Sequence, residues 1–234
     1  MSVWNKKQSH RRVVAAHLHL KIGELFYFLE MIEEGAKGIK DAVLIKSNDV
    51  AEYNAKVIFG SSAFCNAIQS LKDATATTIC EKVEWSDIES NCRHGKYFYE
   101  IRNASTHDGI SVTNLWIDGR VYPSSMVERF GLGNKEITVI APNQEIPVCC
   151  REFAIDFVAY LRKRLLPYLN QNELKGASPI SEAQIQAFCS DSRIPASVAK
   201  YVVGQAEALI AGLRMQTADP IATAIAKIDS KTSQ

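Results

Sequence analysis

The chain has 234 residues, of which 27 are basic and 26 acidic, so its formal net charge at pH 7 is only +1. This near balance excludes the strong positive field of an obligate nucleic-acid coat or a membrane-surface protein, and any polyanion would have to bind a local patch. The length is sufficient for one main domain and a smaller extension, because domains typically have about 100 to 200 residues.

The N-terminal region lacks the apolar core of a signal peptide. Its run VVAA is interrupted by His17, His19 and Lys21, before it reaches about 7 to 15 apolar residues. No segment approaches the roughly 20 apolar residues of a membrane span. We therefore expect a cytoplasmic protein without membrane contacts.

The six cysteines include no CxxC pair, and we interpret them as reduced thiols that act as small apolar residues. Cys92 and His94 could share a metal in principle, but no second pair of ligands lies nearby in the sequence. We expect neither a metal nor a cofactor.

Apolar residues recur at helical spacing over residues 9–34 and again after the polar pair Ser47 and Asn48. Gly35 and Gly38 are expected to end the first helix, and Ser47 with Asn48 to cap the second. Two long amphipathic helices joined by a short polar connection predict an antiparallel pair.

Two further helices are separated by a segment with strand signals. A third helix is predicted over residues 86–106, closed by Gly109. The stretches TNLWI and RVYPSS flank Asp118-Gly119, which predicts a hairpin with a type I′ turn, and KEITVIAP predicts one more strand. The fourth helix is predicted over residues 149–169.

The predicted elements indicate a mainly α protein. We expect a four-helix up-and-down bundle over residues 1–170, with a small β insert at about 110–145 between the third and fourth helices. Residues 171–234 are expected to form a helical extension, with helices over 181–189 and 195–215.

The stretch FYEIRNASTHDG places Arg102, Asn103 and His107 near the end of the predicted third helix. An imidazole can move a proton near neutral pH, and a guanidinium matches phosphate oxygens. On a straight α-helix Arg102 and His107 would lie about 140° apart, so they would share a face only if the helix ended between them. Asn103 and His107 are i, i+4 neighbours, so the amide could orient the imidazole.

The arginine, polar residue and histidine of IRNASTH resemble the motif of the HEPN superfamily (higher eukaryotes and prokaryotes nucleotide-binding). That family is a four-helix bundle with the motif near the end of its third helix, and many members are metal-independent RNases. The resemblance covers residues 9–170 and implies that Arg102, Asn103 and His107 are the catalytic residues.

The resemblance also implies a mechanism and an assembly. A 2′-hydroxyl of RNA would attack the adjacent phosphorus, His107 would move the proton, and Arg102 would hold the charge of the phosphorane. The products would end in a 2′,3′-cyclic phosphate and a 5′-hydroxyl, and DNA would survive. The family pairs two protomers around a composite site, which implies a homodimer, or a heteromer with a regulatory partner.

The spacing alone is weak support, because Arg12 with His17 fits it equally well. The candidate differs in its context, since Asn103 follows the arginine and Asp108-Gly109 breaks the helix just beyond. In the alternative interpretation Arg102 is a surface cation at a helix C-terminus and His107 a helix cap.

Two basic clusters could guide RNA phosphates, although charge runs are more often solvated faces. They comprise Lys6, Lys7, Arg11 and Arg12 in one cluster and Arg162, Lys163 and Arg164 in the other. Trp116, Tyr122 and Phe130 could stack on bases, or pack the small sheet across its strands.

Functions of other classes remain open at this point. The chain could be a non-catalytic helical module that binds a protein, with the β insert and the C-terminal helices as contact surfaces, or a regulator that binds RNA or a nucleotide without cleaving it. As a nuclease it would resemble toxins and phage-defence effectors, and a protein inhibitor would be a further partner.

Overall fold

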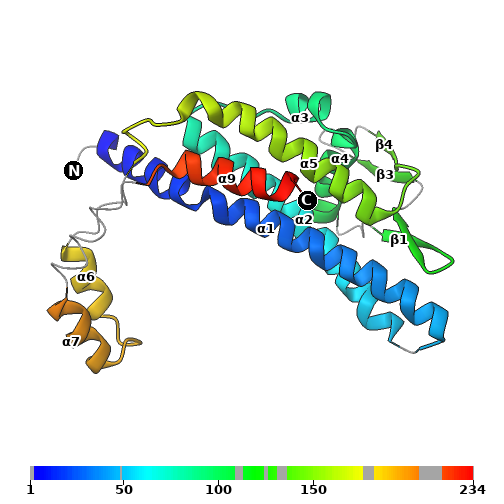
Figure 1. Ribbon diagram of the computed structural model, residues 1–234, viewed down its shortest axis with the longest axis horizontal. Coiled ribbons are helices and arrows are strands. Elements are labelled where there is room, and N and C mark those ends of the chain that lie inside the picture. The colour runs from blue at the N-terminus through cyan, green and yellow to red at the C-terminus, as the bar shows by residue number, and fades with distance from the viewer. Residues whose placement is uncertain are drawn as a thin grey trace.

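The computed structural model describes most of the chain and is mainly helical, as predicted (Figure 1). The described residues are 3–47, 49–108, 113–123, 126–130, 136–175, 182–205 and 218–233. Within these ranges, none of the helices combines the length and the apolar character that are needed to cross a membrane.

The first two helices, α1 (Val3–Ile45) and α2 (Val50–Ile79), form a long antiparallel hairpin. The prediction that Gly35 and Gly38 end the first helix is wrong, because α1 continues for two further turns. Both glycines face α2 instead. A Cβ on Gly35 would lie 2.9 Å from the carbonyl oxygen of Tyr53, and one on Gly38 would overlap the Tyr53 ring. These glycines therefore allow the helices to approach closely.

The predicted third helix is broken into three pieces, α3 (Trp85–Asn91), α4 (Gly95–Asn103) and a π-helical turn, η1 (Ala104–Asp108). The break comes at His94, whose φ of 61° is left-handed. Gly95 then lets the chain turn back onto α3, because a Cβ there would lie 2.7 Å from the Cα of Glu89. The helical periodicity of the sequence gives no sign of such a reversal of the chain.

The β insert consists of two antiparallel hairpins. The first pairs β1 (Thr113–Ile117) with β2 (Arg120–Pro123), and positive φ values at Asp118 and Gly119 confirm the predicted type I′ turn. The second pairs β3 (Met126–Phe130) with β4 (Glu136–Ile140). The last strand was predicted from KEITVIAP, but β3 was not.

The fourth bundle helix, α5 (Ile146–Leu165), is followed by a short 3₁₀ turn, η3 (Leu166–Tyr168). Its aromatic residues complete the core with residues of α2 and α4. Phe98 lies 4.5 Å from Phe153 and 5.7 Å from Phe64 between ring centroids, and Phe157 stacks on Phe153. This aromatic cluster fixes α4, and with it the segment that follows.

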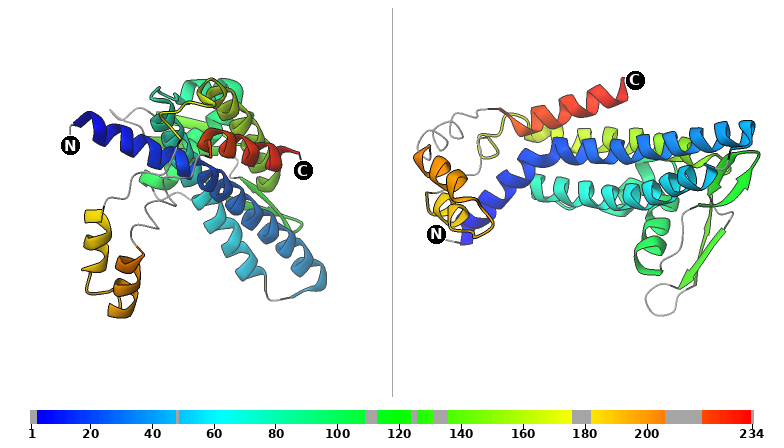
Figure 2. Two further views of the ribbon diagram at one scale, coloured as in Figure 1. Left: turned by 60° about the vertical axis from the view of Figure 1, so that its left-hand side comes forward. Right: turned by 90° about the horizontal axis from the view of Figure 1, so that it is seen from below.

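Three helices are described in the C-terminal part, α6 (Glu182–Cys189), α7 (Ala196–Gly204) and α9 (Pro220–Thr232). The first two lie within predicted ranges, and the predicted continuation beyond residue 205 falls outside the described residues. In Figures 1 and 2, α6 and α7 stand apart from the bundle, whereas α9 lies along α1.

The helix α9 was not predicted, and it shares the core of the bundle. Its buried face consists of Pro220, Ile221, Ala224, Ile225 and Ile228. The predicted extension of residues 171–234 therefore contains one helix that packs on α1 and α5. The division of the chain at residue 170 stays a prediction.

Candidate functional site

The motif begins in the last turn of α4, where Arg102 is half-buried between α4 and α2. Its Nη1 donates to the Oδ1 of Asn103 at 2.7 Å. Its Nε is buried and has no hydrogen-bond acceptor in the part of the chain that the structure describes. A buried donor without an acceptor costs about 1 to 3 kcal/mol, so this guanidinium is oriented but not satisfied.

His107 lies in the π-helical turn η1, and its side chain falls outside the described residues. Arg102 lies outside this turn, in the last turn of α4, which ends at Asn103. The regular α-helix therefore ends between Arg102 and His107, which is the condition under which the two could share a face. The expected amide contact between Asn103 and His107 stays a prediction.

The motif segment lies against α2, near Ser62 and Cys65. The hydroxyls of Ser62 and Ser105 lie 3.4 Å apart. The Cys65 thiol is fully buried near Arg102, and burial raises its pKa to about 12 although the positive charge of Arg102 acts in the opposite direction. A thiol with so high a pKa stays protonated at neutral pH and is a poor nucleophile.

A buried ion pair, which the sequence did not reveal, ties the β insert to the motif helix. The Nη1 of Arg129 in β3 donates to the Oε2 of Glu100 in α4 at 3.2 Å, and the two side chains are 8% and 11% exposed. Arg102 follows Glu100 by two positions, so the pair anchors the same short helix that carries the motif.

A second network, also missed, joins the break before α4 to α5. Arg93 donates from Nε and Nη2 to the carboxylate of Asp156 at 2.8 and 3.0 Å, and from Nη1 to Glu152 at 3.0 Å. The Nε2 of His94 donates to the other oxygen of Glu152 at 2.8 Å. The hydrogen bonds from Arg93 hold the pKa of Asp156 below its usual range.

Cys92 and His94 are not arranged to bind a metal ion together. His94 is engaged with Glu152, and burial raises the pKa of the Cys92 thiol to about 12. Among the described residues, His, Cys, Asp and Glu side chains nowhere gather in a group of three that could hold a metal ion.

Several residues of the two basic clusters are bound within the chain. The Nε of Arg11 donates to the carbonyl oxygen of Thr78 at 2.6 Å, and the Nε of Arg12 to that of Glu173 at 2.7 Å. Arg162 pairs with Asp229 at 2.8 Å, and Arg164 pairs with Glu81 at 2.9 Å. Lys7 and Lys163 are exposed, and the side chain of Lys6 falls outside the described residues. These contacts join α1, α2, α5 and α9, so the four arginines have structural roles.

The aromatic residues of the β insert differ in exposure. Phe130 is 68% exposed and Tyr122 is half-buried, whereas the side chain of Trp116 falls outside the described residues. Stacking on a base therefore stays a prediction, for which Phe130 is the accessible candidate.

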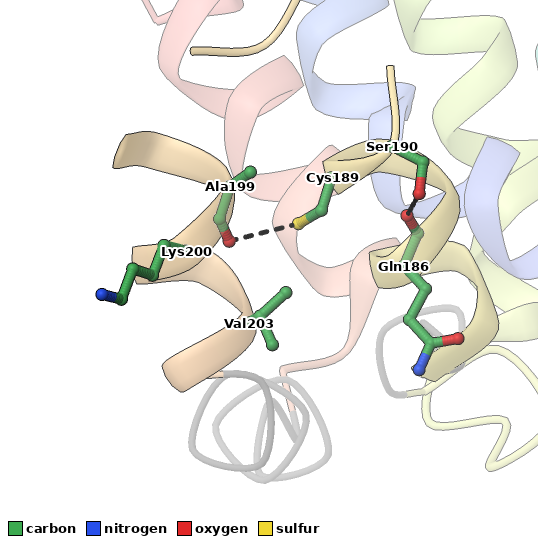
Figure 3. A pocket seen from close by; sticks show the side chains of 6 residues that line it. All are labelled: Gln186, Cys189, Ser190, Ala199, Lys200 and Val203. Atoms are coloured by element: carbon green, nitrogen blue, oxygen red, sulfur yellow. Dashed lines mark hydrogen bonds between the residues drawn. The ribbon is translucent and has the colours of Figure 1, made fainter. Parts of the chain in front are cut away.

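A hollow of about 440 Å³ lies between α6 and α7 (Figure 3). The Sγ of Cys189 donates to the carbonyl oxygen of Ala199 at 3.6 Å, whereas Lys200 points away from α6. In its described part, this helix pair exposes four large apolar side chains. Its exposed large residues are Phe188, Val198, Tyr201 and Val203.

Comparisons with protein-family models, with curated proteins and with solved structures found no match to this chain. The arrangement of the described residues therefore carries the functional argument.

Proposed function

We propose that this chain is a metal-independent endoribonuclease of the HEPN type, with Arg102, Asn103 and His107 as its catalytic residues. The observation that carries the proposal is the position of Arg102. Its buried Nε has no acceptor in the described part of the chain, and it stands two residues before the π-helical turn that contains His107. Single π turns occur frequently at functional sites.

Each residue has a chemical task in the cleavage. His107 removes the proton from a 2′-hydroxyl, whose oxygen attacks the adjacent phosphorus. The bond to the 5′-oxygen breaks, and that oxygen takes up a proton. Arg102 donates hydrogen bonds to the phosphorane oxygens, and Asn103 holds the guanidinium through the bond to its Oδ1. The products are a 2′,3′-cyclic phosphate and a 5′-hydroxyl.

The proposed active form is a homodimer in which two motifs meet in one cleft, so that one histidine acts as base and the other as acid. A HEPN-type bundle of α1, α2, α4 and α5, with the β insert before α5, would be its scaffold. A role as a toxin or phage-defence effector, held in check by a protein inhibitor, belongs to the same proposal.

The test is cleavage of mixed-sequence RNA by the purified chain in EDTA, with the product ends assigned by mass. His107→Ala should abolish cleavage, and DNA should stay intact. His17→Ala is the matched control, because Arg12 and His17 have the same spacing but Arg12 is bound to Glu173 and His17 donates to the carbonyl oxygen of Val13. Arg102→Lys should lower the rate by roughly 100-fold or more.

Equal cleavage by the wild type and His107→Ala would refute the proposal. So would the absence of cleavage in a folded wild type over a range of RNA substrates. A second candidate, a non-catalytic module that binds a protein, would then stand first. The apolar surface of α6 and α7 favours that alternative.

A further inference from the structure

The outer face of α1 carries a ridge of large apolar side chains that the bundle does not cover. Val13, Leu20 and Tyr27 are 37%, 56% and 60% exposed. They follow one another at seven-residue intervals, which is close to two helical turns and places them in one line. The solvent face of a surface helix normally carries polar side chains instead.

A hollow of about 530 Å³ adjoins this ridge, between α1 and α9. Its lining residues are His19, Leu20, Gly23, Thr223, Ala226, Lys227 and Ser230. The two helices run parallel here, since a Cβ on Gly23 would lie 3.6 Å from the Cε of Lys227, and Lys231 pairs with Glu30 at 2.6 Å further along. The hollow exists because most of these facing positions hold small residues.

Ridge and hollow together form a self-complementary surface. Ala16 and Gly23 follow Val13 and Leu20 by three positions, so large and small residues alternate along α1 in the spacing of a helix pair that packs knobs into holes. A two-fold axis would set the ridge of one copy against the hollow of another.

The charges at this surface also favour a second copy. Lys21 pairs with Glu24 at 2.6 Å, and Lys231 pairs with Glu30. These two lysines are neutralised within the chain, whereas Lys227 in the hollow has no ion pair among the described residues. Most of the charge beside the ridge is therefore balanced, which limits the repulsion between two identical surfaces.

We propose that two copies of this chain associate through α1 and α9, with Leu20 and Tyr27 of each copy packed into the hollow of the other. This inference does not rest on the proposed nuclease function. Gly60 of α2 faces α1, where a Cβ would lie 3.0 Å from Ile32, whereas Ser62 faces the motif at Ser105. Positions two apart in sequence point about 200° apart around a helix, so this surface and the motif lie on opposite sides of α2. The interface proposed here is therefore separate from the one that would join two motifs, and a chain that used both would form a tetramer.

The test is the solution mass of the full chain, measured by sedimentation equilibrium over a range of concentrations. The wild type should have a mass that is an even multiple of 26.0 kDa, and Leu20→Glu and Tyr27→Glu should each halve it. Leu44→Glu is the matched control, because Leu44 is 73% exposed at the end of the same helix but lies off the ridge. This control should keep the wild-type mass.

Gly23→Leu provides a second route, since it fills the hollow without placing a charge on α1, and it should also halve the mass. Circular dichroism melts identify the variants that remain folded. A wild type with the mass of one chain at every concentration overturns the inference. The inference is also overturned if folded Leu20→Glu, Tyr27→Glu and Gly23→Leu keep the wild-type mass, or if Leu44→Glu halves the mass as well. The nuclease proposal is judged separately, by RNA cleavage and His107→Ala.

Discussion

Replacing Arg129 by leucine should destabilise the protein more than the loss of an exposed ion pair does. Arg129 and Glu100 lie 3.2 Å apart, and their side chains are 8% and 11% exposed. Removal of one member leaves the other charge buried without this partner, which costs about 3 to 5 kcal/mol. In a protein of this size, a loss of about 3 kcal/mol lowers the melting temperature by roughly 6 to 12 °C.

Thermal and urea unfolding, followed by circular dichroism, measure this cost. The matched control is Arg120→Leu in the same insert. Arg120 pairs with Glu145 at 3.3 Å, and the side chains are 50% exposed for Arg120 and 33% exposed for Glu145. Such a pair contributes less than about 1 kcal/mol. The double variant Glu100→Gln with Arg129→Leu should recover part of the loss, since neither charge remains. If Arg129→Leu melted like Arg120→Leu, the reasoning would be refuted.

Two further predictions concern the end of the chain and the buried thiols. Asp219→Ala should lower the free energy of unfolding in urea by about 0.5 to 2 kcal/mol. The Oδ1 of Asp219 accepts from the amide of Ile221 at 2.8 Å, and its Oδ2 accepts from the amide of Asn170 at 2.5 Å. If Asp219→Ala were as stable as Asp219→Asn, which keeps a capping side chain, this role would be contradicted. Burial raises the pKa of Cys65 to about 12, from an ordinary 9.0. The unfolded chain therefore loses this proton at a lower pH than the folded chain, so the free energy of unfolding should fall between about pH 9 and pH 12. The fall should be less steep in Cys65→Ala. Identical slopes in the two proteins would contradict this effect of the buried thiol.

The long helices of the bundle and the first hairpin could be predicted because their signals are local. Residues 9–34 and 149–169 repeat apolar side chains at helical spacing, and Asp118-Gly119 has the φ values that a type I′ turn requires. The end of α1 could not be predicted in this way. Gly35 and Gly38 look like helix ends in a single sequence, yet their role depends on Tyr53 in the facing helix.

The same distinction between local and long-range signals applies to the candidate site. Arg102, Asn103 and His107 could be named from their spacing and from the residues beside them. The contacts that support the site could not, because Arg129 and Glu100 are 29 positions apart and Arg93 and Asp156 are 63 apart. No local pattern links such residues, and only the packing of β3 on α4 and of α3 and α4 against α5 brings them together.

By itself, then, the sequence determined the mainly helical class, the type I′ hairpin and the residues of the motif, since periodicity, turn chemistry and spacing act over a few residues. The tertiary structure alone decided that α9 returns to the bundle, that His94 breaks the third helix and that four of the basic residues are bound within the chain. These outcomes depend on which surfaces meet, and burial and ion pairing between distant segments settle that choice.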